Sequence, residues 1–169
     1  SKICIPKGKY CVITVHRFEN ISNKKRFDKI LNYVTNVAKK IKVLFILHPP
    51  TRKRLEDYDY MNRISKNRNI ELRPRYNYFD FINLIENSEF IITDGGSNQE
   101  ESYYLGKPCL IMRNETERNE GLKKNAMLCK FDDNLFNRFI KNYLLFKRKK
   151  LLVNVYPSNL IVNKIKRFI

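Results

Sequence analysis

The stretch that decides the fold is Phe90-Ile-Ile-Thr-Asp-Gly-Gly-Ser-Asn-Gln-Glu-Glu101. Its first four residues are apolar or β-branched, which predicts a buried strand at 90–93. A turn at 94–97 follows, and residues 98–105 predict a helix that ends at Gly106, because glycine is favoured just after a helix. A buried strand that runs through a glycine turn into a helix is typical of an α/β sheet.

The same alternation continues on both sides of this stretch. Phe27, Ile30, Leu31 and Val34 recur at the spacing of one apolar helix face. Strands are predicted at 10–15, 43–47, 69–73, 90–93 and 108–112, and helices at 27–41, 51–65, 78–87, 98–105, 132–147 and 159–169. This alternation predicts an α/β fold, a Rossmann-like parallel sheet with helices on both faces. We expect residues 1–169 to form a single domain with one sizeable core.

The chain is strongly basic, with a formal net charge of +17. Such a surface attracts nucleic acid nonspecifically, so a basic nucleic-acid-binding module is one hypothesis. The charges are spread along the chain, in short clusters at 24–25, 39–40, 52–54, 123–124 and 147–150. No nucleic-acid-binding motif accompanies them, which favours solvated helix faces and no specific nucleic-acid partner.

The composition also bounds the class of protein. Hydrophobic residues make up 43% of the chain, which indicates a globular protein. No apolar run is long enough to span a bilayer, and the first residues show no signal-peptide pattern, so we expect a soluble, cytoplasmic protein without a membrane partner. The four cysteines form no Cys-x-x-Cys pair, which predicts reduced, buried thiols and no zinc site.

Three loops are candidates for ligand binding, because ligands of open parallel sheets bind beyond the carboxyl ends of the strands. They are residues 16–20, 48–51 and 94–97. In the third loop, Gly95 and Gly96 let the backbone approach a ligand, Ser97 adds a hydroxyl, and the following helix N-terminus favours an anion. This pattern predicts phosphate binding, although an ordinary glycine turn explains the two glycines equally well.

Charged side chains gather at the same edge of the predicted sheet. His16 and Arg17 follow the first strand, and arginine is suited to a forked contact with a diphosphate. His48 ends the next strand along the chain. Arg118 suits a phosphate or a base carbonyl, unless it is an ordinary surface arginine. The two histidines predict no metal site, since no third ligand is evident.

Two further residues fit a nucleotide. Glu101, with Glu100 beside it, lies one turn into the helix, where a carboxylate accepts hydrogen bonds from paired ribose hydroxyls. Stabilisation of the helix dipole explains an acid there as well. Phe81, with Tyr78, offers an aromatic face for a base, although helical spacing alone favours a core position for Phe81.

These motifs resemble those of the bacterial UDP-N-acetylglucosamine 2-epimerases. His16-Arg-Phe-Glu-Asn20 resembles their His-Arg-x-Glu-Asn motif, and residues 93–101 resemble their Ser/Thr-Asp-Ser-Gly-Gly-x-Gln-Glu-Glu segment. Residues 105–118 are similar to Leu-Gly-Lys-Pro-Val-Leu-x-x-Arg-x-x-Thr-Glu-Arg at almost every position, and Tyr78-Phe-Asp-Phe81 falls at their Tyr-x-x-Phe segment. The resemblance covers roughly residues 11–165.

The resemblance implies a glycosyltransferase-B architecture of two Rossmann-like halves, and this chain is similar to the C-terminal, UDP-sugar-binding half. It implies a catalytic role for His16 near the diphosphate. Glu19 and His48 are expected to face a second, regulatory nucleotide-sugar site. No cofactor or metal is implied, and the full enzyme is expected to allow a homo-oligomer. The UDP-binding residues that it implies are Arg17, Phe81, Gly95, Gly96, Ser97, Glu101 and Arg118.

The implied reaction interconverts UDP-N-acetylglucosamine and UDP-N-acetylmannosamine by elimination and re-addition of UDP, for the synthesis of surface polysaccharides. A hydrolysing epimerase and a glycosyltransferase of the same architecture are the alternatives. In the family, the acids that move the C2 proton belong to the N-terminal half, which this sequence lacks. We therefore expect the chain to be inactive without that half, as a truncated enzyme or one chain of a split enzyme.

Two positions depart from the family pattern. The segment Asp-Ser-Gly-Gly is Asp94-Gly-Gly-Ser97 here, so the hydroxyl group is displaced along the loop. The proline that follows Thr-Glu-Arg in the family is Asn119. We expect phosphate binding to survive, because backbone amides make most of the contact. Both changes leave room for a divergent substrate.

Overall fold

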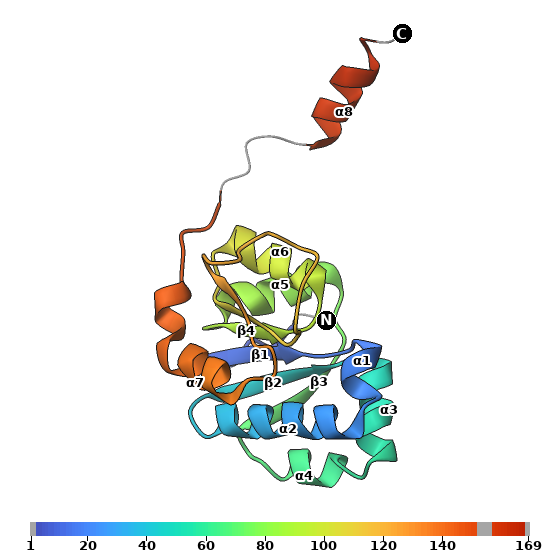
Figure 1. The fold of residues 1–169 in the computed structure, drawn as a ribbon, viewed down its shortest axis with the longest axis vertical. Helices are drawn as coiled ribbons and strands as arrows, with labels where there is room; N and C mark the ends of the chain where they lie inside the picture. The colour runs from blue at the N-terminus through green and yellow to red at the C-terminus, as the bar shows by residue number, and fades with distance from the viewer. Residues whose placement is uncertain (1–2, 152–156, 168–169) are drawn as a thin grey trace.

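The computed structural model describes residues 3–151 and 157–167. Their strands form one parallel sheet in the order β3-β2-β1-β4-β5-β6, which is the order of the doubly wound Rossmann-like fold (Figure 1). The expected α/β fold class is confirmed. The strands are β1 (Tyr10–Thr14), β2 (Lys42–Leu47), β3 (Ile70–Pro74), β4 (Ile91–Thr93), β5 (Cys109–Ile111) and β6 (Ala126–Leu128).

Helices cover both faces of the sheet, as predicted. In Figure 1, α2, α3, α4 and α7 lie on one side of the strands, and α5 and α6 lie on the other. The helices are α1 (Phe18–Ile21), α2 (Lys24–Ala38), α3 (Pro49–Asp57), α4 (Met61–Ser65), α5 (Tyr78–Asn87), α6 (Gly96–Leu105), α7 (Asp133–Asn142) and α8 (Pro157–Ile165), with a 3₁₀ helix at Tyr143–Phe146.

The side chains of β1 show why the sheet is buried on both faces. Cys11 and Ile13 belong to the core beneath α2 and α7, whereas Tyr10 and Val12 pack on the other face with Leu84 of α5. Successive residues of a strand point to opposite faces, so a strand covered on both sides needs a continuous apolar run. Three of the four free cysteines are buried within this packing, while Cys4 is exposed.

Several predicted boundaries are wrong. The single helix expected at 51–65 is divided into α3 and α4, because the chain turns at Asp59, whose φ is 57°. The helix expected at 132–147 ends at Asn142 and continues as the 3₁₀ helix. The helix predicted to begin at residue 98 begins at Gly96. Gly95 is therefore its N-cap residue and Gly96 its first residue. Neither β6 nor α1 was predicted.

The C-terminal part of the chain crosses the end of α6. The backbone N–H of Arg148 donates to the Gly106 carbonyl at 2.9 Å, and that of Leu151 donates to Tyr104 at 2.8 Å. Helix α8 lies apart from the sheet (Figure 1). It begins at Pro157 rather than at the predicted residue 159, and residues 168–169 of that prediction lie outside the described residues. No helix in the described ranges is long and apolar enough to cross a membrane.

Candidate functional site

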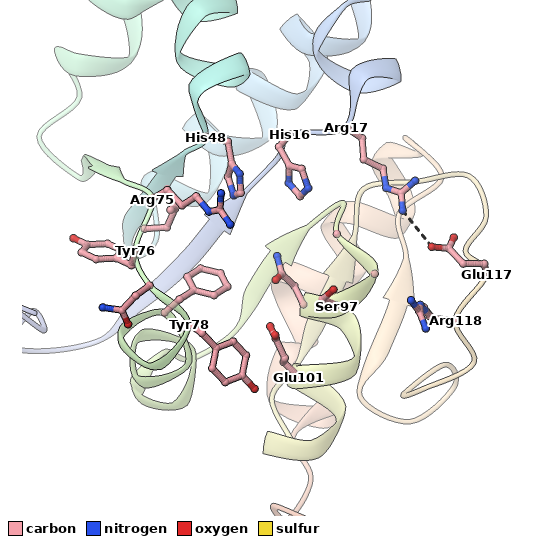
Figure 2. Close-up of a pocket in the computed structure, with 16 residues that line it drawn as sticks. His16, Arg17, His48, Arg75, Tyr76, Tyr78, Ser97, Glu101, Glu117 and Arg118 are labelled. Carbon is pink, nitrogen blue, oxygen red and sulfur yellow. Dashed lines mark hydrogen bonds and ion pairs between the residues drawn. The ribbon is translucent and has the colours of Figure 1, made fainter. Parts of the chain in front are cut away.

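A cavity of about 490 Å³ opens at the carboxyl ends of β1 and β4 (Figure 2). These two strands are neighbours at the point where the strand order reverses. After β1 the chain forms the short α1 and then α2, and after β4 it forms α6; α2 and α6 cover opposite faces of the sheet, and ligands of doubly wound folds bind in the crevice at such a point. The volume lies within the range of cavities that bind small ligands.

Asp94 joins the two loops that form the floor of the cavity. Its fully buried carboxylate accepts hydrogen bonds from the backbone N–H of His16 at 3.0 Å, from that of Arg17 at 2.9 Å, and from Asn20 Nδ2 at 2.9 Å. His16 Nδ1 lies 3.3 Å from Asp94 Oδ1. A buried carboxylate needs such partners, so this network fixes the loop after β1 against the loop after β4.

Arg17 is held in one orientation at the edge of the cavity. Its Nε donates to the Asp94 backbone carbonyl at 2.8 Å, and its Nη2 lies 3.2 Å from Glu117 Oε1. Glu117 also pairs with Arg113 at 2.6 Å. Its own backbone N–H and then Arg113 lower the pKa of Glu117 to about 2, so it stays ionised and keeps Arg17 in place.

The N-terminus of α6 faces the cavity without a side-chain cap. Gly95 is the N-cap residue, and no side chain of the described residues takes that role. A Cβ atom at Gly95 would lie 3.2 Å from His16 Cε1, and one at Gly96 would lie 3.3 Å from Arg118 Nε. The glycines therefore let the loops approach closely, while the first N–H groups of α6 stay available to a ligand.

Glu101 lies one turn into α6 and lines the same cavity. Its Oε2 is buried and has no hydrogen-bond partner among the described residues. Burial, and then the neighbouring charge of Glu100, raises the pKa of Glu101 to about 7. Glu100 itself pairs with Arg118 at 2.7 Å. The cavity thus holds an acceptor that the protein leaves unsatisfied, which is a common property of ligand sites.

The two histidines stack on each other at the mouth of the cavity. The ring centroids of His16 and His48 are 4.4 Å apart, with 15° between the planes. Burial, followed by the proximity of His16 and Arg75, lowers the pKa of His48 to about 4. His48 is therefore neutral near pH 7 and acts as a hydrogen-bonding group there, not as a cation.

The structure brings almost all of the predicted site residues together. Phe81 both lines the cavity and packs against the core, so the two interpretations of this residue are compatible. Glu19 lines a separate hollow of about 180 Å³ with Arg26 and Arg113, so it does not share a cavity with His48. The predicted residues that line the main cavity are His16, Arg17, His48, Phe81, Gly95, Gly96, Ser97, Glu101 and Arg118.

Sequence reasoning missed several residues of the cavity wall. Arg75, Tyr76 and Asn77 follow β3, so the rule about the carboxyl ends of strands would have found them had it been applied to this strand. Asn98 and Glu117 also line the cavity. In the sequence, only their positions within the motifs at 93–101 and 105–118 could have indicated this. The role of Asp94 as the acceptor that joins the loops was not predicted.

The fold and the cavity define an open Rossmann-like α/β domain with a ligand crevice at its switch point. Comparison with known families places it further. A family model described as UDP-N-acetylglucosamine 2-epimerase matches residues 1–154. The chain belongs to the UDP-N-acetylglucosamine 2-epimerase family.

Individual relatives agree with this assignment. UDP-N-acetylglucosamine 2-epimerases of Methanococcus maripaludis and Methanocaldococcus jannaschii are 37% and 32% identical, over 70% and 83% of this chain. The matches span only 33% and 38% of those relatives. A structure of the M. jannaschii enzyme in complex with UDP-GlcNAc and UDP has a TM-score of 0.81 at 26% identity, and covers 95% of this chain and 45% of that one. These relatives are archaeal, so the likeness is not confined to the bacterial enzymes.

Proposed function

We propose that this chain is the C-terminal, UDP-sugar-binding half of a UDP-N-acetylglucosamine 2-epimerase. The observation that carries the proposal is the composition of one cavity. An uncapped helix N-terminus, two arginines held by carboxylates, and the unsatisfied carboxylate of Glu101 meet in a volume of about 490 Å³. The complex of the M. jannaschii relative with UDP-GlcNAc and UDP supports the proposal.

The phosphates are assigned to the glycine loop. In this loop, residues 95–97, Gly96 and Ser97 provide N–H groups at the positive end of the α6 dipole. The N–H of Gly95 donates to Thr93 Oγ1 at 3.0 Å, so Gly95 contributes to the phosphate site through its missing side chain, which lets the ligand and His16 come close. Arg17 lies at the same end of the cavity, where its guanidinium neutralises a diphosphate. His16, packed against Gly95, is placed next to the departing phosphate and is the catalytic residue that we assign to this half.

The nucleoside is assigned to the rest of the cavity. Glu101 is one helical turn from Ser97, so its free oxygen is placed for ribose hydroxyls next to bound phosphates. Phe81 presents its ring to the cavity and provides a face for the base. Arg118 lines the end near Glu117 and completes the UDP contacts.

In the proposed reaction, the sugar loses its C2 proton and UDP by elimination. UDP then adds back, and C2 takes up a proton on the opposite face, so the configuration at C2 is inverted. The donors of the glycine loop and Arg17 are fixed before the reaction, so they stabilise the charge that develops on departing UDP. The acids that move the C2 proton are assigned to an N-terminal half, since this chain spans about a third of its curated relatives. We therefore expect no turnover by the chain without that half. A second, regulatory nucleotide-sugar site that includes Glu19 and His48 is also proposed, and it would have to extend across the two separate cavities that these residues line. A cytoplasmic location and a homo-oligomeric full enzyme remain part of the proposal.

Calorimetric titration of the chain with UDP tests the proposal. We expect saturable binding that is weakened at least ~10-fold in Gly96→Asp, which places a negative charge among the phosphate-binding amides, and in Glu101→Ala. Glu56→Ala, an exposed acid on α3, is the matched control and should bind like wild type. Absence of UDP binding by the folded wild-type chain, or equal binding by all variants, would refute the proposal.

The chemical outcome needs the complete enzyme. With an N-terminal half supplied on a second chain, we expect UDP-N-acetylmannosamine to form from UDP-N-acetylglucosamine. Release of free N-acetylmannosamine instead would favour the hydrolysing alternative, which uses the same UDP-binding half.

A further inference from the structure

Arg75 is a cavity residue to which the proposed function gives no role. It lies in the loop between β3 and α5 and lines the cavity together with Tyr76 and Tyr78. Figure 2 shows the Arg75 side chain beside His48 and the Tyr78 ring directed toward the helix that carries Ser97 and Glu101, while the Tyr76 ring points away from them. The wall that carries Arg75 is therefore aromatic, whereas the opposite wall is the phosphate-binding loop and its helix.

The guanidinium of Arg75 is free, unlike those of the other arginines in the cavity. Arg17 pairs with Glu117, and Arg118 pairs with Glu100. Arg75 makes no hydrogen bond or ion pair with any residue in the described ranges 3–151 and 157–167. Arginine has five N–H donors and no acceptor, so a free guanidinium on a cavity wall is ready to bind an acceptor of the ligand.

Arg75 is not placed for the phosphates that the glycine loop would hold. The ring of His16 packs against Gly95, and the ring of His48 stacks on His16 at 4.4 Å. Arg75 stands beside His48, on the side of the cavity away from Arg17 (Figure 2). Two imidazole rings thus lie between the glycine loop and Arg75, so the group that reaches Arg75 belongs to another part of the ligand.

That part is the base. Aromatic side chains bind bases by stacking, and two aromatic residues of the cavity, Tyr78 and Phe81, belong to α5, the helix that directly follows the loop of Arg75. The hydroxyl of Tyr76 already accepts a hydrogen bond from Arg73 at 3.1 Å, and Asn77 caps α5 through Asp80. Arg75 is therefore the long donor of this loop that is free to reach the edge of a stacked base.

Building on the proposed function, we infer that Arg75 selects the base of the nucleotide by donating hydrogen bonds to a carbonyl oxygen on its edge. Uracil carries O4 at the position where cytosine carries an amino group. An amino group is a donor, and a guanidinium cannot accept from it, so cytosine would leave both groups unpaired. Arg75 thus favours UDP over CDP, although both present the same diphosphate to the glycine loop.

The test compares UDP, CDP and uridine as ligands of the wild-type chain and of Arg75→Ala. We expect Arg75→Ala to bind UDP and uridine each about 10-fold more weakly, and to bind CDP with little change, because one base contact of this kind is lost. The preference for UDP over CDP then falls by about 10-fold. Arg52→Ala, an exposed arginine on α3 outside the cavity, is the matched control and should leave all three affinities unchanged.

The alternatives give different results. Equal weakening of UDP and CDP, with uridine unchanged, would show that Arg75 contacts phosphate and would overturn the inference. So would an Arg75→Ala variant that binds all three ligands like wild type, even though Gly96→Asp abolishes UDP binding; the proposed function would then stand without the inference. Arg75 is exposed and has no partner in the part of the chain that the structure describes, so we expect unchanged thermal unfolding of the variant, which would show that the comparison is between folded proteins.

Discussion

Two cavities of nearly equal size lie at opposite edges of the sheet. The cavity at the carboxyl edge measures about 490 Å³, and a hollow of about 520 Å³ lies at the amino edge, where β1 and β2 begin. We call the second one the lysine hollow, because Lys9, Lys39, Lys40 and Lys42 line it. Neither volume nor the presence of cations separates the two, so the difference must come from how their polar groups are fixed.

The charges of the two cavities are held differently. Arg17 is bound by Asp94 and Glu117 next to the uncapped N-terminus of α6. In the lysine hollow, Lys39 and Lys40 follow the C-terminal end of α2, where the negative end of the helix dipole favours cations without any ligand. Fixed donors and an unsatisfied acceptor therefore mark a ligand site, whereas the helix end itself explains the position of Lys39 and Lys40.

The largest effect is expected from Asp94→Ala. This change leaves the N–H groups of His16 and Arg17 and the Asn20 amide without their acceptor, and should lower the free energy of unfolding by about 3–5 kcal/mol. Thermal unfolding should show a midpoint about 10 °C lower. Asp57→Ala, which breaks exposed pairs with Lys53 and Arg54, should change stability by less than about 1 kcal/mol. Equal effects of the two changes would contradict the central role of Asp94.

The two ends of α6 should respond differently to alanine. Gly106 has a φ of 65°, and a Cβ there would overlap the backbone of Arg148, so Gly106→Ala should cost about 2–3 kcal/mol of stability. A Cβ at Gly96 meets only the side chains of Glu117 and Arg118, which can move. Gly96→Ala should therefore affect UDP affinity more than stability. Chemical denaturation and UDP titration of both variants test this, and the reverse pattern would rule out the assignment of the glycine loop.

Glu101 should make stability depend on pH. Its pKa is raised from 4.5 to about 7 in the folded state, so the folded chain binds more protons than the unfolded one between these values. The free energy of unfolding therefore falls as the pH rises from about 4.5 to 7. Glu101→Gln removes this loss and should be more stable than wild type by about 1 kcal/mol at pH 8, with little difference at pH 4.5.

Melting curves of Glu101→Gln and wild type at both pH values measure the difference. Glu86→Gln, an exposed acid that pairs with Lys150, is the control and should show no such gain at pH 8. A wild-type chain as stable as Glu101→Gln at pH 8 would mean that the carboxylate is better solvated than its burial indicates.

The smallest effect on UDP binding is expected from the lysine hollow. The double variant Lys39→Ala/Lys40→Ala should bind UDP within about twofold of wild type, and its stability should change by less than about 0.5 kcal/mol. Salt-dependent binding to duplex DNA should weaken, because that binding follows total charge. Tight DNA binding that UDP cannot displace, lost in this variant, would instead favour the nucleic-acid hypothesis.

Most of the fold could be predicted because its strands are buried on both sides. Runs such as 43–47 and 90–92 are continuously apolar, and the spacing of Phe27, Ile30 and Val34 defines the buried face of α2. The strand β6 has only three residues, and its pairing with β5 decides its place. The break between α3 and α4 at Asp59 could not be predicted either, because Leu55 and Ile64 are both buried and continue the apolar pattern across it.

The site could be predicted only in part. The motifs placed His16, the glycines and Glu101 at one edge of the sheet, and the structure gathers them in one cavity. The partners of Asp94 are 74 to 78 residues away in the sequence, so its role depends on tertiary packing that no local pattern contains. Similarly, the sequence places Arg75 after a strand, but only the structure shows that its guanidinium has no partner among residues 3–151 and 157–167.

The most direct test of UDP binding at the carboxyl edge of the sheet is to record amide chemical shifts of the chain while UDP is added. We expect the largest changes at Gly95, Gly96 and Ser97, with smaller ones at Glu101 and Arg17, while the amide resonances of residues 39–42 do not shift. Changes centred on the lysine hollow, with the glycine loop unaffected, would contradict the assignment, because UDP would then bind the lysines and not the helix N-terminus at the carboxyl edge of the sheet.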